Sequence, residues 1–250
     1  MADAPLIDPR FKELFAQVSA HIRSRLKLII FFFLFGLVIG IPLAKEVVEH
    51  LLNSDILPAG VNVIVLTPVE FIMIQVRSAA WLGAGLAIAA LLVDLAWKSE
   101  LNQKIPKPGK VVFLSILSML ILAGAGLFYS WELLTPMLLQ YLSEDAQSAG
   151  LSTEWRLSSF VGFILNLCLA SVIGFQAPVL TILAIRSGAV ERGLLVQYRR
   201  HIWFTTFVLG AAFSPPDPLS LFLVAIPIIL LFELAMVFDA LTGKKPDANI

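Results

Sequence analysis

Long apolar runs separated by short polar segments dominate this chain. The hydrocarbon core of a bilayer is about 30 Å thick, so a helix needs roughly 20 mostly apolar residues to cross it. The chain is 58% hydrophobic and 14% charged, whereas soluble domains average about half apolar and about a quarter charged residues. We therefore predict an all-α membrane protein with six transmembrane helices in one integral membrane domain, residues 1–250. The expected spans are about 27–44, 71–97, 111–137, 158–185, 202–214 and 219–238.

The last two of these helices are expected to be short. As a helix the run 202–214 would rise only about 20 Å, so on length alone it also fits a re-entrant segment. We favour two separate helices, because 219–238 is a full span with a single acid. Pro215 and Pro216 would then form a tight outer hairpin, and Asp217 would cap the sixth helix.

Charge predicts the orientation. With six spans, every Lys and Arg except Lys45, Arg77 and Arg156 falls in segments on one side of the membrane. The positive-inside rule then puts both termini in the cytoplasm, with an amphipathic N-terminal segment at 1–26 and a tail at 239–250. The first 25 residues show no early hydrophobic core, so no cleavable signal peptide is expected.

Composition and motifs exclude several classes of protein. The net charge of zero argues against a nucleic-acid surface. The single cysteine, Cys168, lies in an apolar run, so neither a disulfide framework nor a thiol metal site is expected. The chain has no G-x-S-x-G, H-E-x-x-H or P-loop motif, so we expect no enzyme, no cofactor and no metal.

Two polar residues lie deep in expected spans. The uncharged stretch 219–232 places Glu233 about 21 Å from the outer turn, where an acid marks either function or a polar helix contact. Gln176 is followed by Pro178, which kinks a helix and frees a backbone carbonyl. A kink beside a polar side chain fits a groove lining or, alternatively, interhelical packing. Arg77 follows a capping box, Thr67 to Glu70, and can reach the outer surface from there.

The C-terminal third resembles the signature region of the TatC family, the large subunit of the twin-arginine protein translocase. The likeness rests on a basic pair, a T-P-P-D-like turn, a serine, an A-I-P and an L-[YF]-E at matching spacing. In this chain these are Arg199–Arg200, Ser214–Asp217, Ser220, Ala225–Pro227 and Leu231–Glu233. Weaker similarity upstream includes Phe175–Gly188, Ala96–Glu100 and the second half of a family start motif at His21–Leu26.

This resemblance implies a receptor in the cell membrane rather than an enzyme. TatC proteins bind twin-arginine signal peptides and export folded proteins with single-span TatA and TatB partners, driven by the proton-motive force. The fold implied is a concave, cup-like bundle, as a homo-oligomer in the translocase complex and in contact with membrane lipid. The implied signal-peptide recognition residues are Glu100, Arg23, Glu13 and His21, and the implied polar lining of the cavity is Gln176 and Glu233.

Two departures predict a divergent family member. His21 stands where the family has an N-terminal glutamate, so half of the expected acidic recognition site is either missing or supplied by Glu13. Gln176 replaces a glutamate of the fourth span, which removes the charge while keeping the hydrogen bonding. Two other functions remain open: a secondary transporter lined by Arg77, Gln176 and Glu233, or a TatC-like protein that has lost signal-peptide recognition.

Overall fold

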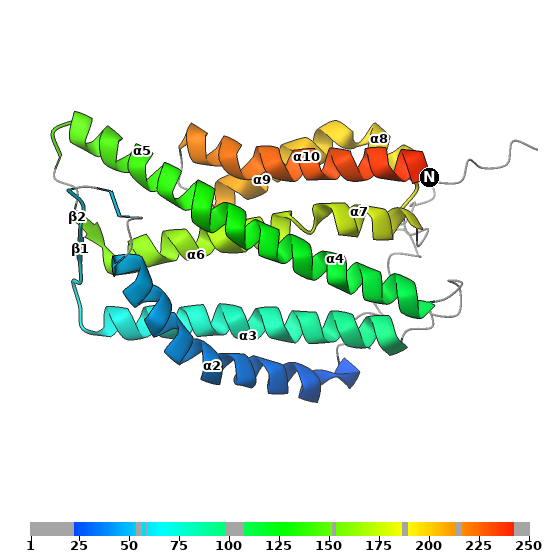
Figure 1. Ribbon diagram of the computed structural model, residues 1–250, viewed down its shortest axis with the longest axis horizontal. Coiled ribbons are helices and arrows are strands. Elements are labelled where there is room, and N and C mark those ends of the chain that lie inside the picture. The colour runs from blue at the N-terminus through cyan, green and yellow to red at the C-terminus, as the bar shows by residue number, and fades with distance from the viewer. Residues whose placement is uncertain are drawn as a thin grey trace, which may run out of the picture. The chain divides into compact units, whose positions relative to one another are not determined.

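The computed structural model describes residues 23–53, 57–58, 60–98, 108–151, 154–186, 190–213 and 217–242 (Figure 1). Within these ranges the protein is helical, with two short strands and with five helices long and apolar enough to cross a membrane. In chain order the elements are α2 (Leu26–Asn53), β1 (Asn62–Ile64), α3 (Val69–Lys98), α4 (Pro108–Phe128), η2 (Tyr129–Leu134), α5 (Thr135–Ser148), β2 (Glu154–Arg156), α6 (Leu157–Gly174), α7 (Ala177–Arg186), α8 (Arg192–Gln197), α9 (Arg199–Phe213) and α10 (Pro218–Thr242).

Five of the six expected spans have a counterpart among these long helices. The remaining one, 202–214, corresponds to α9, which has only 15 residues and would rise about 22 Å. A sixth crossing therefore stays a prediction. Many large apolar side chains remain exposed along the helices, among them Phe31, Leu120 and Leu234 at 63%, 64% and 63%. Helices that are apolar on all sides are typical of membrane spans.

Two helices continue beyond their expected ends. The expected first span stops at residue 44, but α2 runs to Asn53; the third was expected to stop at 137, but α4 continues through the π-helical stretch η2 into α5, which ends at Ser148. The extension of α5 is amphipathic: Leu138 and Leu139 are buried, whereas the acids that follow are exposed. A count of apolar residues misses a helix that continues on one packed face.

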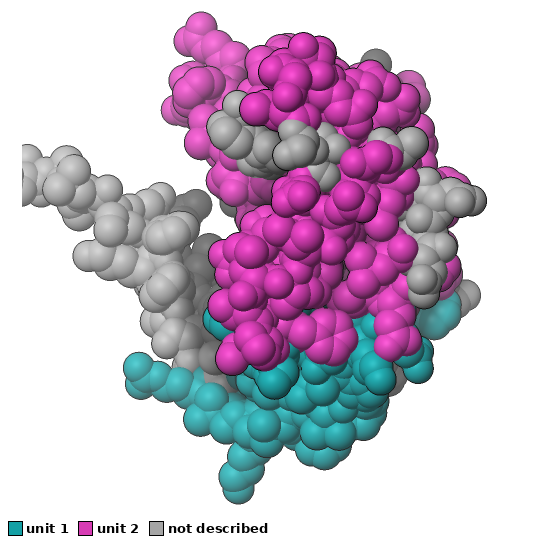
Figure 2. Space-filling view, turned by 90° about the vertical axis from the view of Figure 1, so that its left-hand side faces the viewer, with its two compact units in different colours: residues 1–47, 72–113 teal, residues 48–71, 114–250 magenta. Residues whose placement is uncertain are grey.

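The described residues divide into two compact units, coloured separately in Figure 2. Unit 1 comprises residues 1–47 and 72–113, and unit 2 comprises 48–71 and 114–250. In unit 1, α2 and α3 approach so closely that a Cβ on Gly36 would lie 2.4 Å from the Cα of Gly83. One turn along, a Cβ on Gly40 would lie 2.6 Å from the Cα of Ala79. This is a small-xxx-small contact on both helices, which allows backbones to pack directly in a membrane.

The core of unit 2 joins η2 and α5 to α6 and α10. Its buried centre contains Leu134, Leu138, Leu167, Ala170 and Val224. The hydroxyl of Tyr129 donates a hydrogen bond of 2.8 Å to the carbonyl of Leu223, which anchors η2 to α10. At one end of this unit β1 and β2 form a two-stranded parallel ladder, in which Val63 pairs with Trp155.

The fourth apolar run is broken into α6 and α7. The turn consists of Phe175 and Gln176, and Pro178 is the second residue of α7. Proline has no backbone N–H and its ring excludes the preceding helical turn, which accounts for the interruption at this point. The break leaves the Gln176 side chain at the junction of two helices.

Candidate functional site

A cluster around Glu233 joins α10 to the start of α9. The Nε of Arg199 donates to one carboxylate oxygen at 2.5 Å, and a second guanidinium nitrogen donates to the other oxygen. The indole Nε1 of Trp203 donates to the same carboxylate at 2.9 Å, and the guanidinium lies 5.8 Å from the centre of the Trp203 ring. The Glu233 side chain is 17% exposed, so its charge has little contact with solvent. The Arg199 guanidinium compensates that charge. Bidentate geometry of this kind fixes the angle between two helices as well as neutralising the acid.

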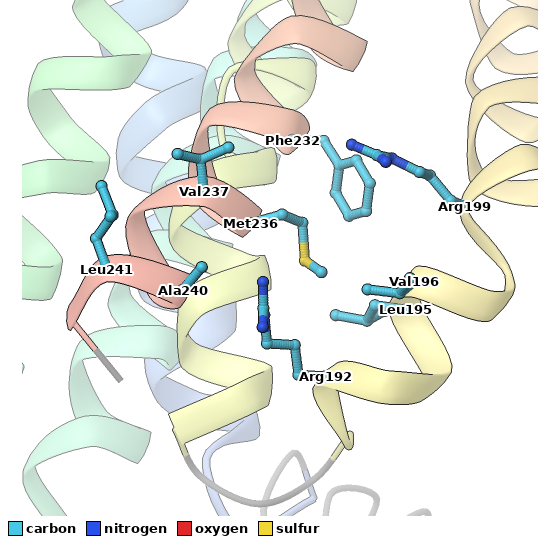
Figure 3. Close-up of a pocket in the computed structure, with 9 residues that line it drawn as sticks. All are labelled: Arg192, Leu195, Val196, Arg199, Phe232, Met236, Val237, Ala240 and Leu241. Atoms are coloured by element: carbon cyan, nitrogen blue, oxygen red, sulfur yellow. The ribbon is translucent and has the colours of Figure 1, made fainter. Parts of the chain in front are cut away.

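Next to this cluster lies a groove between α8, the start of α9 and the end of α10. Its volume is about 330 Å³, and Figure 3 shows Phe232 and Met236 on one wall facing Leu195 and Val196 on the other. The complete lining is Arg192, Leu195, Val196, Arg199, Phe232, Met236, Val237, Ala240 and Leu241. We call this the α8–α10 groove. Its lining includes two arginines and no acid.

Gln176 occupies a separate contact. Its Nε2 donates to the carbonyl of Val172 at 3.1 Å and, more weakly, to the carbonyl of Met119 in α4 at 3.4 Å. Its Oε1 is buried and has no hydrogen-bond partner among the described residues. Nearby, a Cβ on Gly126 would lie 2.8 Å from the carbonyl oxygen of Ser171, so α4 and α6 are packed backbone to backbone. The Gln176 amide thus joins α4 to the break between α6 and α7. A neutral N–H donor suits this position, because both of its partners are backbone carbonyls.

Asp217 caps α10. Its Oδ1 accepts the backbone N–H of Ser220 at 2.8 Å, and its Oδ2 accepts the Ser220 hydroxyl at 2.5 Å. The contact satisfies an N–H group that has no partner within the helix. The two other hairpin residues singled out in the sequence, Pro215 and Pro216, lie outside the described residues.

One polar centre was not recognised from the sequence. Glu70, identified in the sequence only as the last residue of a capping box, is 2% exposed. Its carboxylate accepts the Leu66 N–H at 3.0 Å, the Arg156 guanidinium and the hydroxyl of Ser158. The motif TPVE signals a helix start, but nothing local to it indicates a cation that follows 86 residues later.

Of the four expected signal-peptide recognition residues, the structure describes only one. Glu13, His21 and Glu100 lie outside the described residues, and Arg23 is exposed just before α2. Gln176 and Glu233 are both described, but they belong to different contacts, one with α4 and one with α9. Within the described part of the chain, no group of three or more His, Cys, Asp or Glu side chains could hold a metal ion.

Comparisons with known proteins agree with one another. The model of a family described as "Sec-independent protein translocase protein (TatC)" matches residues 18–227. Among curated proteins, TatCy of Bacillus subtilis is 26% identical over 227 residues, covering 90% of this chain and 88% of that one. TatC of Aquifex aeolicus is 27% identical over 231 residues, covering 90% and 94%.

A solved structure shares the fold. A crystal structure titled as the twin-arginine translocase receptor TatC superimposes with a TM-score of 0.76 at 24% identity, covering 90% of this chain and 99% of that one. The match to the family model ends at residue 227, so Glu233 and the α10 wall of the α8–α10 groove lie beyond it.

Proposed function

Because the chain belongs to the TatC family of Sec-independent protein translocase proteins, we propose that it is a receptor subunit that binds twin-arginine signal peptides. It is a multi-pass protein of the cell membrane and a translocase component of a transport family that is not enzymatic. The proposal extends this to export of folded proteins, driven by the proton-motive force, together with single-span subunits of the TatA and TatB kind.

The observation that carries the proposal is the extent of the family match. It runs from residue 18 to residue 227 and therefore spans α2 to α9 without leaving out a helix. Within it lies Glu100, in the segment between α3 and α4. A signal peptide with two neighbouring guanidinium groups calls for a carboxylate near the membrane surface, because charge-assisted bidentate pairs supply both energy and geometry.

The proposal also includes an orientation and a way of holding the peptide. Both termini would lie in the cytoplasm, α9 would make a sixth crossing, and Glu100 would then face the peptide from the cytoplasmic side. Arg23, Glu13 and His21 would complete that recognition surface. A concave face of the bundle would accept the apolar segment of the peptide, and several copies would assemble in the translocase.

Gln176 restricts the role that can be proposed for its position in the fourth apolar run. A glutamate in its place could ionise, whereas the amide cannot, and its Nε2 already donates to two carbonyls. We therefore assign Gln176 to holding α4 against the broken helix, not to any step that requires a charge.

The test is export of a folded reporter that carries a twin-arginine signal, in cells where this chain is the only TatC protein and small partners are supplied. Wild type should export the reporter, and Glu100→Ala should reduce export by about tenfold, as expected for one charge-assisted pair. Glu191→Ala, an exposed acid on the same expected side, is the matched control and should leave export unchanged.

A reporter with two lysines in place of its arginines separates recognition from general insertion defects, since lysine cannot form the bidentate pair. If wild type inserts correctly and still exports nothing, the chain is a family member that has lost signal-peptide recognition. If Glu100→Ala and Glu191→Ala behave alike, the recognition site lies elsewhere.

A further inference from the structure

We propose that the α8–α10 groove binds one anionic phospholipid, with the headgroup phosphate on Arg192 and an acyl chain along the apolar walls. This goes beyond signal-peptide recognition, because the groove shares no residue with the surface proposed for the peptide.

The two arginines of the groove differ in what they already bind. Arg199 holds Glu233 through two guanidinium nitrogens, so it is fixed as part of the wall. Arg192 has a loose partner among the described residues: its Nε lies 3.7 Å from Oδ2 of Asp239, longer than a hydrogen bond, and its side chain is 47% exposed. Guanidinium groups bind phosphate oxygens in pairs of parallel hydrogen bonds. Arg192 is therefore the phosphate contact.

The remaining lining is apolar. Phe232 and Met236 of α10 face Leu195 and Val196 of α8 (Figure 3), and the lining also includes Ala240 and Leu241 near the end of α10. A volume of about 330 Å³ falls near the lower limit of ligand pockets, roughly 300–1,000 Å³. The apolar lining matches a single acyl chain in polarity.

The neighbouring side chains place the groove at a membrane surface. Tyr198 and Trp203 are 50% and 40% exposed, and aromatic residues of this kind gather at membrane–water interfaces. On α8, Leu194 and Val196 are exposed beside Arg192, the pattern of a helix lying along the interface. In the orientation proposed above this is the cytoplasmic side, where basic pockets between spans recognise anionic headgroups.

The experiment measures lipid binding to the purified full-length protein in detergent by native mass spectrometry. Phosphatidylglycerol is the anionic probe and phosphatidylcholine of the same chain length is the zwitterionic control. Wild type should bind phosphatidylglycerol more tightly, and Arg192→Gln should weaken that binding about tenfold, as expected for the loss of one charge-assisted contact with the phosphate. Arg200→Gln removes the same charge from an exposed residue outside the lining and should weaken the binding clearly less than Arg192→Gln does.

A second variant tests the walls independently. Ala240→Phe adds a bulky side chain to the lining and leaves Arg192 and Asp239 in the sequence, so it should reduce the binding of both lipids. Arg192→Gln leaves the buried Asp239 without its cation and could therefore fail to fold. In that case the lipid affinity of Ala240→Phe tests the proposal by itself.

Three results would overturn the proposal: equal affinity of wild type for the two lipids, equal effects of Arg192→Gln and Arg200→Gln, or full binding by Ala240→Phe. If a signal peptide displaces the bound phosphatidylglycerol from wild type but not from Ala240→Phe, the groove belongs to the peptide site instead.

Discussion

Arginine is the cation in the ion pairs of Glu70, Asp94, Glu233 and Asp239. Asp94 pairs with Arg25 in unit 1 at 2.8 Å, and in unit 2 Glu233 pairs with Arg199. Guanidinium is less strongly hydrated than ammonium and offers a planar fork of donors, so it loses less on leaving water and binds a carboxylate at two points. The acidic residues within apolar helices are thus paired with guanidinium groups, whose removal from water costs less free energy than that of ammonium groups.

Glu70 gives the sharpest prediction at this scale. Its carboxylate is buried, whereas the Arg156 side chain is 47% exposed, so the arginine compensates a charge that cannot reach water by itself. Arg156→Met should therefore lower the free energy of unfolding, because Glu70 loses its cation and keeps only the hydrogen bonds from Leu66 and Ser158. Chemical unfolding in mixed micelles measures the change.

Two further variants control this prediction. Arg200→Met removes an exposed arginine and should cost little. Adding Glu70→Gln to Arg156→Met removes the buried charge and should restore part of the stability. A double variant whose loss equals the sum of the two single losses would contradict the pairing.

The sequence predicted some of these residues and not others. The depth of Glu233 indicated that it needs a polar partner, because uncharged residues separate it from the turn. It could not indicate Arg199 and Trp203, since the side chains that meet a helix depend on packing between helices. Glu70 was missed for the same reason: Arg156 and Ser158 follow it only after two further spans. Glu13, His21 and Glu100 stay predictions.

At the scale of elements, α2 and α3 are held by small residues. Gly36 packs directly against the backbone of Gly83. Backbone atoms, unlike a side chain, cannot change rotamer to make room for a larger residue. The apolar runs themselves were readable from the sequence, but this contact was not noticed there, because glycines in a hydrophobic run do not alter its span prediction. The spacing of Gly36 and Gly40, four residues apart, is the signal that could have revealed it.

Gly36→Ala should destabilise unit 1 by about 1–3 kcal/mol, because the new methyl group must push the two helices apart. Thermal unfolding in detergent reports the change. Gly85→Ala is the matched control on α3: its added Cβ would meet nothing within 4 Å, so we expect no loss and a slight gain from helix propensity. A similar gain in both variants would show that helix propensity, not close packing, governs this position.

At the scale of the whole molecule, the number of crossings is the open prediction. Charge distribution gives the same cytoplasmic C-terminus whether α9 and α10 cross separately or form a re-entrant hairpin, so the sequence could not separate these cases. The length of α9 does not separate the two cases either, because a bilayer can thin around a short helix at a modest cost in free energy.

Accessibility to a membrane-impermeant thiol reagent separates the two cases. In a Cys168→Ser background, Ser148→Cys and Pro218→Cys should react from outside intact cells, whereas Glu191→Cys should react only after the membrane is opened. All three positions are exposed in the structure. An unreactive Pro218→Cys in a folded protein would indicate that α9 does not cross, and a Glu191→Cys that reacts from outside would reverse the proposed orientation.

The ladder between β1 and β2 sets the order in which this protein can be completed. It pairs residues 62–64 with residues 154–156, so closing it confines a long intervening chain, and such non-local contacts form late. During synthesis Glu70 emerges well before Arg156 and Ser158, its two side-chain donors. A nascent chain that stops before residue 154 must therefore keep this acid in water or pair it elsewhere. The β1–β2 end of unit 2 can be completed only after α6 has been synthesised.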